Sequence, residues 1–267
     1  MKKGSFAELL YREYYLGRNS YITGLLFFVV SVLIGWLALL SLKHGNFGLL
    51  FGDITDGSGS VIENKEVSDI LRLIIILIIK YMPPVMAGMI AVSPTDTACK
   101  DILNKWNRFA HCSPVNPMRY TAVKTVSTAI PTILAFIFAV IYLFTMKPAL
   151  GESFTFGDFS VIILFISFFI TFMSILPQIF IILFRDRDKG WLCTMGVLMV
   201  PIIIISVINA NKEGEIPSAD ENMDTVTLIS KLTDKAQEYC PIAIAVLVIS
   251  FAVMFVSMYL LYKRREK

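Results

Sequence analysis

Lys80 is the residue of this sequence whose type and position most clearly suggest chemistry. It is the one charged residue of the apolar run 73–92, and Pro83 and Pro84 follow it closely. A cation at the centre of a bilayer costs about 2.5–3.5 kcal/mol, and each proline leaves the carbonyl four residues earlier without its backbone donor. We expect a kink here that faces protein or water. Three interpretations of Lys80 stay open: a cation lining a path across the membrane, a lysine held by carbonyls or by neighbouring Asn or Thr side chains, or a residue nearer the outer surface.

The segment 93–125 combines cations with large aromatic side chains. Thr95 or Asp96 can cap a short helix over 95–112, which two later prolines would end. Apolar positions at helical spacing form one face: Ile102, Leu103, Trp106, Phe109 and Ala110. We expect the charged positions to face water: Lys100, Asp101, Lys105 and Arg108. This amphipathic helix either covers the inner ends of a helical bundle or docks an intracellular partner through its aromatic residues and cations.

Cysteine and histidine chemistry is not indicated by the sequence. The cysteines form no CxxC pair, and the two histidines are far apart: Cys99, Cys112, Cys193, Cys240, His44 and His111. We therefore expect neither a zinc site nor a disulfide framework. The acids of the turn 185–190 alternate with cations, which favours a solvated turn over a pair of catalytic carboxylates.

The composition is that of an integral membrane protein. Of the 267 residues, 56% are hydrophobic and 17% are charged, whereas soluble domains average about 45–50% and about 25%. A helix needs roughly 20 apolar residues to cross the hydrocarbon core. We therefore predict an all-α polytopic fold with six transmembrane helices in a single transmembrane domain over 1–267. The predicted spans are 21–42, 70–92, 120–146, 159–184, 191–208 and 241–262.

The distribution of charge between the loops predicts the orientation. With both ends of the chain placed in the cytoplasm, the inner segments hold sixteen Lys and Arg against seven Asp and Glu, and the outer segments hold six against fourteen. Cytoplasmic loops carry an excess of Lys and Arg. We expect a multi-pass protein of the cell membrane with both termini cytoplasmic.

The N-terminal segment 1–20 is amphipathic. Its apolar residues recur near helical spacing, and Ser5 with Glu8 matches a capping box. We predict a helix over 5–17 that lies flat at the inner interface and turns at Gly17 into the first span; an unstructured tail is the alternative. In the outer segment 209–240, residues from Asp224 to Tyr239 fit an amphipathic helix, either on the surface or as a lid.

One stretch resembles a known family. It contains the residues Asp101, Trp106, Phe109, Ser113-Pro114-Val115, Pro117, Arg119-Tyr120 and Lys124. This spacing resembles the pattern after the second span of ABC-2 type exporter permeases of Gram-positive bacteria, with Ser113 where Leu is usual and Asn116-Pro117 where a Ser-Arg-like pair is usual. The number of spans, the cytoplasmic termini and the N-terminal helix extend the resemblance over most of the chain.

The resemblance implies that this chain holds no ATPase of its own, and the sequence has no GxxxxGK[ST] run. A separate ATPase subunit would bind ATP and Mg²⁺, so we expect no cofactor and no enzymatic activity in this chain. The helix over 95–112 would be a coupling helix that contacts the ATPase through Asp101, Lys105, Trp106, Arg108 and Phe109. The helix at 5–17 is similar to the family's elbow helix. A second permease chain, identical or related, would complete the exporter of a peptide, lipid-like or drug-like substrate.

Two other functional classes stay open. A secondary transporter would show an inverted repeat and acids within its spans, neither of which we find in the sequence. A non-transporting sensor or immunity-type membrane protein would need no coupling helix and no ATPase. In every case the lipid bilayer is a partner, and we expect no nucleic-acid partner.

Overall fold

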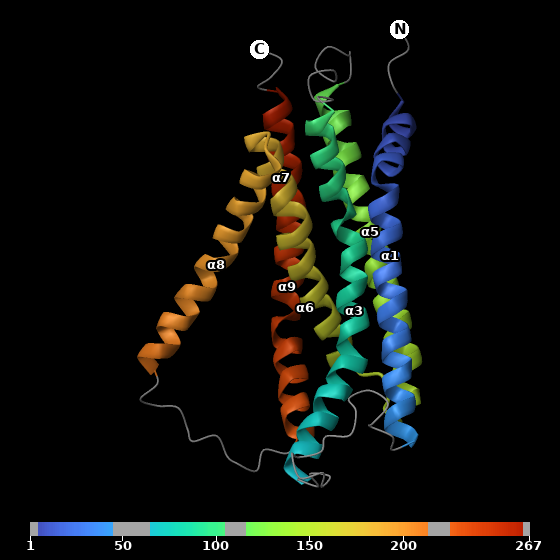
Figure 1. Cartoon of the computed structure of the whole chain (residues 1–267). Helices are drawn as coiled ribbons and strands as arrows, with labels where there is room; N and C mark the ends of the chain where they lie inside the picture. Colours follow the sequence, from blue (N-terminus) through green and yellow to red (C-terminus); the bar gives the residue numbers. More distant parts are fainter. Residues whose placement is uncertain (1–4, 45–64, 105–115, 213–224, 264–267) are drawn as a thin grey trace, which may run out of the picture.

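The computed structural model describes residues 5–44, 65–104, 116–212 and 225–263, and over these residues it is helical with no strand. The elements are α1 (Phe6–His44), α3 (Lys65–Leu103), α5 (Pro117–Ala149), α6 (Phe156–Ile170), the π-helix η1 (Thr171–Ile175), α7 (Leu176–Phe184), α8 (Arg187–Lys212) and α9 (Thr225–Lys263). They form a long bundle from which α8 leans away (Figure 1). We call the end at which α1 begins and α9 ends the terminal end, and the other the opposite end.

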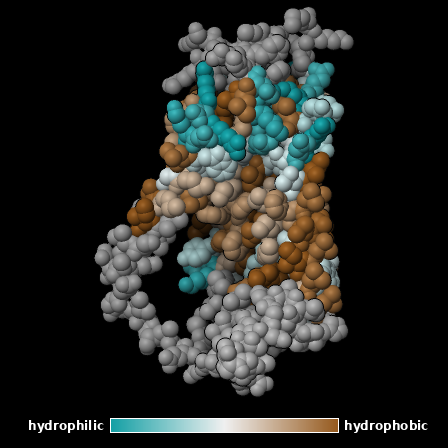
Figure 2. All heavy atoms as spheres, in the orientation of Figure 1, coloured by the Kyte–Doolittle hydropathy of each residue, from teal (hydrophilic) through white to brown (hydrophobic). Residues whose placement is uncertain are grey.

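Five helices of the described chain are long and apolar enough to cross a membrane: Phe6–Ser41, Ile75–Leu103, Pro117–Ala149, Phe156–Phe184 and Thr233–Lys263. They contain the predicted spans three, four and six, all but the last residue of span one, and most of span two. The predicted fifth span, 191–208, lies within α8, which is not one of these five. Figure 2 shows hydrophobic side chains over the middle of the molecule and hydrophilic ones gathered toward the terminal end. The architecture is consistent with a multi-pass membrane protein.

Two predicted helix boundaries are wrong. Helix α1 runs through Gly17 without a turn, so the N-terminal segment continues into the first span instead of forming a separate interfacial helix. A Cβ at Gly17 would come within 3.0 Å of the Thr97 side chain, so this glycine permits close packing of α1 on α3. The predicted capping box is confirmed, because Ser5 and Glu8 exchange backbone-to-side-chain hydrogen bonds of 2.8 and 3.2 Å.

Helix α3 likewise continues through Pro94 to Leu103, so residues 95–103 extend span two and do not begin a separate coupling helix. Thr95 and Asp96 are therefore not capping residues. A proline inside a membrane helix removes one hydrogen bond, which neighbouring side chains can replace. At the other end of the chain, α9 joins the predicted outer helix and the sixth span in one helix that runs through Pro241; Asp224 lies outside the described residues.

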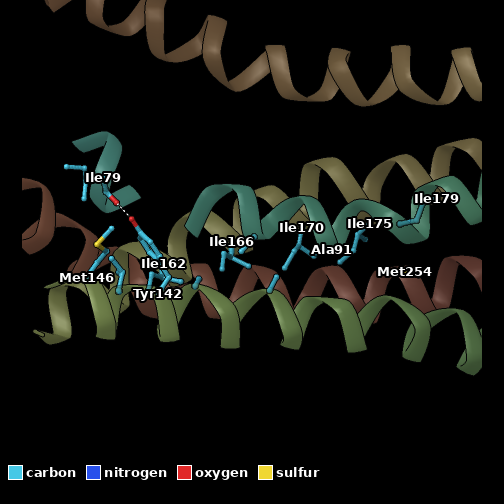
Figure 3. Close-up of a cluster of buried hydrophobic side chains, with 14 of the residues drawn as sticks. Ile79, Ala91, Tyr142, Met146, Ile162, Ile166, Ile170, Ile175, Ile179 and Met254 are labelled. Atoms are coloured by element: carbon cyan, nitrogen blue, oxygen red, sulfur yellow. Dashed lines mark hydrogen bonds between the residues drawn. The ribbon is translucent and has the colours of Figure 1, made fainter. Parts of the chain in front are cut away.

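Two hydroxyl groups compensate for prolines in the middle of the bundle. Pro83 has no N–H to donate to the carbonyl of Ile79, and the Tyr142 hydroxyl of α5 donates to that carbonyl at 2.5 Å. This contact lies beside the buried isoleucine-rich core (Figure 3). Pro177 similarly leaves the Met173 carbonyl without its donor, and Thr95 of α3 lies 3.2 Å from that oxygen. The π-helix η1 falls at this second site, as is common where a helix is locally disrupted.

The Tyr142 contact gives a first prediction. Substitution Tyr142→Phe leaves the Ile79 carbonyl unpaired and should lower the free energy of unfolding by about 1 kcal/mol, measured by SDS titration in mixed micelles. In a Pro83→Ala background the backbone N–H is restored, so the same substitution should cost much less. An equal loss in both backgrounds would contradict the compensation, and Tyr239→Phe at an exposed position is the control.

Candidate functional site

Four buried or half-buried charges meet at the terminal end of the bundle. We call Arg12, Glu13, Asp101 and Lys124 the terminal cluster. Lys124 of α5 lies 2.6 Å from Glu13 of α1 and 2.5 Å from Asp101 of α3. Arg12 pairs with Glu13 at 2.8 Å and with Asp101. The side chains of Glu13, Asp101 and Lys124 are 1%, 3% and 1% exposed, so two acids and two cations neutralise one another inside the protein.

Two tyrosines extend the terminal cluster to a fourth helix. Tyr120, one turn before Lys124 on α5, donates to the Asp101 carboxylate at 3.2 Å. Its ring meets the ring of Tyr262 of α9 edge-on, with centroids 4.7 Å apart. Asp101 thus accepts from a lysine, an arginine and a tyrosine. Helices α1, α3, α5 and α9 are consequently joined at one level of the bundle.

A second polar layer connects α1 and α3 one turn from the terminal cluster. Ser20 donates to the Asp96 carboxylate at 2.6 Å, and Lys100 reaches the same carboxylate at 2.7 Å. Lys100 also donates to the backbone carbonyl of Leu16 at 2.8 Å. These contacts fix the register of the two helices along their length.

The predicted docking residues have mixed outcomes. The expectation that Asp101 faces water is wrong, since its side chain is 3% exposed and is enclosed by its three partners. The physical reason is that residues 95–103 continue the spanning helix, so they face other helices instead of solvent. Lys105, Trp106, Arg108 and Phe109 lie outside the described residues, and their contact with an ATPase stays a prediction.

A second group of charges lies at the opposite end, and it contains Lys80. We call Lys80, Lys147, Glu152 and Asp158 the opposite cluster. The amine of Lys80 contacts Glu152 at 2.7 Å, and that of Lys147 contacts Asp158 at 2.5 Å and Glu152 at 3.5 Å. Glu152 lies in the short connection between α5 and α6, and its side chain is 41% exposed. Lys80 therefore pairs with a half-exposed acid in the connection at the opposite end of the bundle, and its three interpretations stay predictions.

The opposite cluster is built on a helix start. Thr155 precedes α6, and Asp158 three residues later completes a capping box. The Asp158 carboxylate accepts from the Thr155 hydroxyl at 2.5 Å and from its backbone N–H at 3.0 Å. Pro83 and Pro84 are buried within α3, a turn away from Lys80. The role of these three residues in a translocation path is untested by this geometry.

Sequence reasoning did not identify Glu13, Lys124, Lys147 or Asp158 as members of ionic clusters. The available signal was weak: Lys124 and Lys147 lie at the two margins of the apolar run of span three. Their partners are up to 111 positions away in the chain, so no local pattern reveals the pairing. Within the described residues no group of three or more His, Cys, Asp or Glu is arranged to hold a metal ion.

What the clusters can do chemically follows from their composition. Each holds two acids and two cations, and neither includes a histidine, a cysteine or a nucleophile with an adjacent base. Both are therefore suited to holding helices in register instead of performing covalent chemistry. Comparison with protein-family models, with curated proteins and with solved structures finds no match for this chain.

Removing the central cation tests the terminal cluster. Lys124→Met leaves Glu13 and Asp101 buried with Arg12 as their one remaining cation, and should lower the free energy of unfolding by about 3–5 kcal/mol. Adding Glu13→Gln should restore part of the loss, because the charge balance is recovered. Lys189→Met, at an exposed position, is the control and should change stability little; a similar loss in the control would contradict the assignment.

The two lysines of the opposite cluster should differ in their contributions. Lys147→Met leaves Asp158, whose side chain is 4% exposed, without its cation. The free energy of unfolding should fall by about 2 kcal/mol or more. Lys80→Met leaves Glu152 in contact with water, so the free energy of unfolding should fall by at most about 1 kcal/mol. Unfolding titrations of the two variants under identical conditions provide the comparison, and a larger cost for Lys80→Met would refute the order.

Proposed function

We propose that this chain is the membrane-spanning subunit of an ABC exporter, driven by a separate ATPase subunit and assembled with a second permease chain. The observation that carries the proposal is the terminal cluster, read together with the resemblance of the stretch 101–124 to ABC-2 permeases. That stretch begins and ends in two residues of the cluster, Asp101 and Lys124, which contact one another at 2.5 Å. A partner that binds the connection between these two residues would therefore act on two helices, α3 and α5, that a buried ion pair holds together.

The geometry supports a specific way of transmitting force. In the sequence, residues 104–116 connect α3 to α5, and both helices are bound to α1 through Glu13 and Arg12. A partner that closes on ATP and moves this connection would therefore shift three helices together. In this mechanism nucleotide biases a two-state arrangement of the spans. The energy comes from the ATPase, and the chain itself contributes attachment and movement.

The partner surface in this proposal is the set Lys105, Trp106, Arg108 and Phe109, and Asp101 is removed from it because it is buried. The terminal end would face the cytoplasm, since the inner segments of the sequence carry most of the Lys and Arg. The exported substrate would be a peptide, lipid-like or drug-like molecule. In Figure 1 the beginning of α1, the end of α3, the start of α5 and the end of α9 lie at this one end, and we propose this end as the face that an ATPase binds.

Co-purification tests the proposal. The full chain, expressed together with its neighbouring genes, should co-purify with an ATPase subunit after detergent extraction, and Trp106→Ala or the pair Lys105→Glu and Arg108→Glu should reduce the retained amount at least fivefold. Lys189→Glu, which reverses one charge on the neighbouring turn, is the matched control. Unchanged retention in the docking variants, with normal expression of the chain, would overturn the proposal.

A further inference from the structure

The two ionic clusters are about as far apart as the two faces of a bilayer's hydrocarbon core. Lys124 of the terminal cluster and Lys147 of the opposite cluster both belong to α5 and lie 23 positions apart, which is about 34 Å of helix. The hydrocarbon core is about 30 Å thick, and the headgroup regions extend the bilayer to about 40–45 Å. Both clusters therefore fit just outside a hydrocarbon core that is centred on residues 135–136, the middle of this part of α5.

Contacts between helices carry this centre across to α1 and α3. Gly24 lies eleven residues past Glu13 on α1, and Ile90 lies eleven residues before Asp101 on α3. These two residues are packed together, because a Cβ at Gly24 would come within 3.0 Å of the Ile90 backbone. Their contact is about 16 Å of helix from the terminal cluster, the same depth as the middle of α5. We call this level the midplane.

The large side chains that α5 exposes between its two lysines are apolar, as lipid contact requires. They are Ile130, Ile133, Leu134, Ile137, Ile141 and Phe144. Thr145 is also exposed, and its hydroxyl donates to the Tyr142 carbonyl at 2.8 Å, so it adds no unpaired donor to the apolar surface. Figure 2 shows the corresponding hydrophobic zone over the middle of the molecule.

Three tyrosines of α1 fall in the layer next to this core. Tyr11, Tyr14 and Tyr15 are 68%, 62% and 53% exposed. They lie nine to thirteen residues before Gly24, which places them about 13–20 Å from the midplane. The headgroup region extends from about 15 Å to about 20–22 Å from the centre of a bilayer. Tyrosine is enriched at this depth because its ring is apolar and its hydroxyl is polar.

Arg18 extends the same exposed surface of α1. It lies about 9 Å from the midplane, and its guanidinium is 4.7 Å from the centre of the Tyr15 ring, nearer the terminal end. The side chain thus carries its charge away from the midplane, as long cations do at the margin of the hydrocarbon. The rings of Tyr11 and Tyr15 stack with centroids 6.4 Å apart. We call Tyr11, Tyr14, Tyr15 and Arg18 the tyrosine face.

We propose that the tyrosine face lies among the lipid headgroups at the terminal end, with the midplane of the bilayer at the contact of Gly24 with Ile90. Both ionic clusters then lie at the boundaries of the hydrocarbon core. Lys80 is ten residues from Ile90, about 15 Å from the midplane, so its amine pairs with Glu152 at the hydrocarbon margin. This placement does not depend on the proposed transport function.

A different placement follows from the hydropathy of α3 alone. The predicted second span, 70–92, has its centre two residues past Ile79, whose carbonyl accepts from Tyr142 of α5. A midplane near Tyr142 would lie about 10 Å closer to the opposite end, and would put Lys147 inside the hydrocarbon. The structure favours the first placement, because Ile75 and Ile79 are buried between helices and need no contact with lipid.

Depth measurements on spin labels distinguish the two placements. The full chain, with alanine in place of its four cysteines, is reconstituted in palmitoyl-oleoyl phosphatidylcholine vesicles. Collision of each label with oxygen and with a water-soluble nickel chelate gives its depth. Labels on Leu134→Cys and Ile137→Cys should be the deepest and equal, and labels on Ile130→Cys and Ile141→Cys should be equal to each other and about 6 Å shallower. A maximum at Ile141→Cys or Phe144→Cys would establish the alternative and overturn the proposal.

Three labels on α1 test the tyrosine face, all at exposed positions where a label leaves the helix packing intact. The nickel collision rate on Tyr15→Cys should be severalfold above that on Leu25→Cys, which lies beside the midplane. It should be severalfold below that on Glu8→Cys, which lies about 24 Å from the midplane and beyond the headgroups.

The tyrosine face would be wrongly placed if the label on Tyr15→Cys were as deep as that on Leu25→Cys, or as accessible to nickel as that on Glu8→Cys. Low collision rates with both oxygen and nickel at Tyr15→Cys would assign this face to a protein contact, such as a second copy of the chain, and would also overturn the proposal.

Discussion

The neutral group of four charges around Lys124 is the interaction on which the terminal end of the bundle depends. In a bilayer the hydrophobic effect does not hold helices together, because lipid chains are as apolar as the side chains they would replace. Specific polar contacts and close packing must do so. Lys124 and Asp101 are nearly inaccessible, and separation of α1, α3 or α5 would leave at least one of these charges in an apolar environment. The cluster therefore opposes both separation and sliding of these helices.

Helix α3 has a central place in the same network because it receives or supplies the compensating contact at each proline considered. Tyr142 of α5 satisfies a carbonyl of α3 beside Pro83, and Thr95 of α3 contacts the carbonyls beside Pro177. With no water in the hydrocarbon region, an unpaired carbonyl has to find such a donor within the protein. Each of these prolines thus requires a hydroxyl group on a neighbouring helix at the level of the unpaired carbonyl. This requirement favours packing against a helix that carries such a group.

The sequence was sufficient for the parts of the fold that depend on local patterns. Hydropathy located the helices that the structure describes as long and apolar, and the spacing of Ser5 and Glu8 gave the start of α1. It was not sufficient where a residue has two opposite uses. Gly17 was expected to end a helix and instead permits close packing, and Thr95 or Asp96 was expected to begin a helix and instead lies inside one.

The ionic clusters show a second kind of limit. Asp101 was expected to face water because charged residues near the end of a span usually do. Its burial depends on Glu13, Arg12 and Lys124, which approach it from two other helices. Only the relative placement of the helices reveals that four charges sum to zero at one point. Lys80 shows the same limit, since its partner Glu152 lies 72 positions away in the chain and no local pattern indicates that pair.

Motion in this bundle is constrained by where the charges are paired. Helices α3 and α5 are joined at the terminal end through Asp101 and Lys124, and at the opposite end Lys80 and Lys147 share Glu152. A change that separated these two helices would have to break a buried ion pair, at a cost of several kcal/mol. Helix α8 takes part in neither cluster and leans away from the bundle (Figure 1). A rearrangement that moves α8 against a fixed unit of α1, α3 and α5 preserves every one of those pairs.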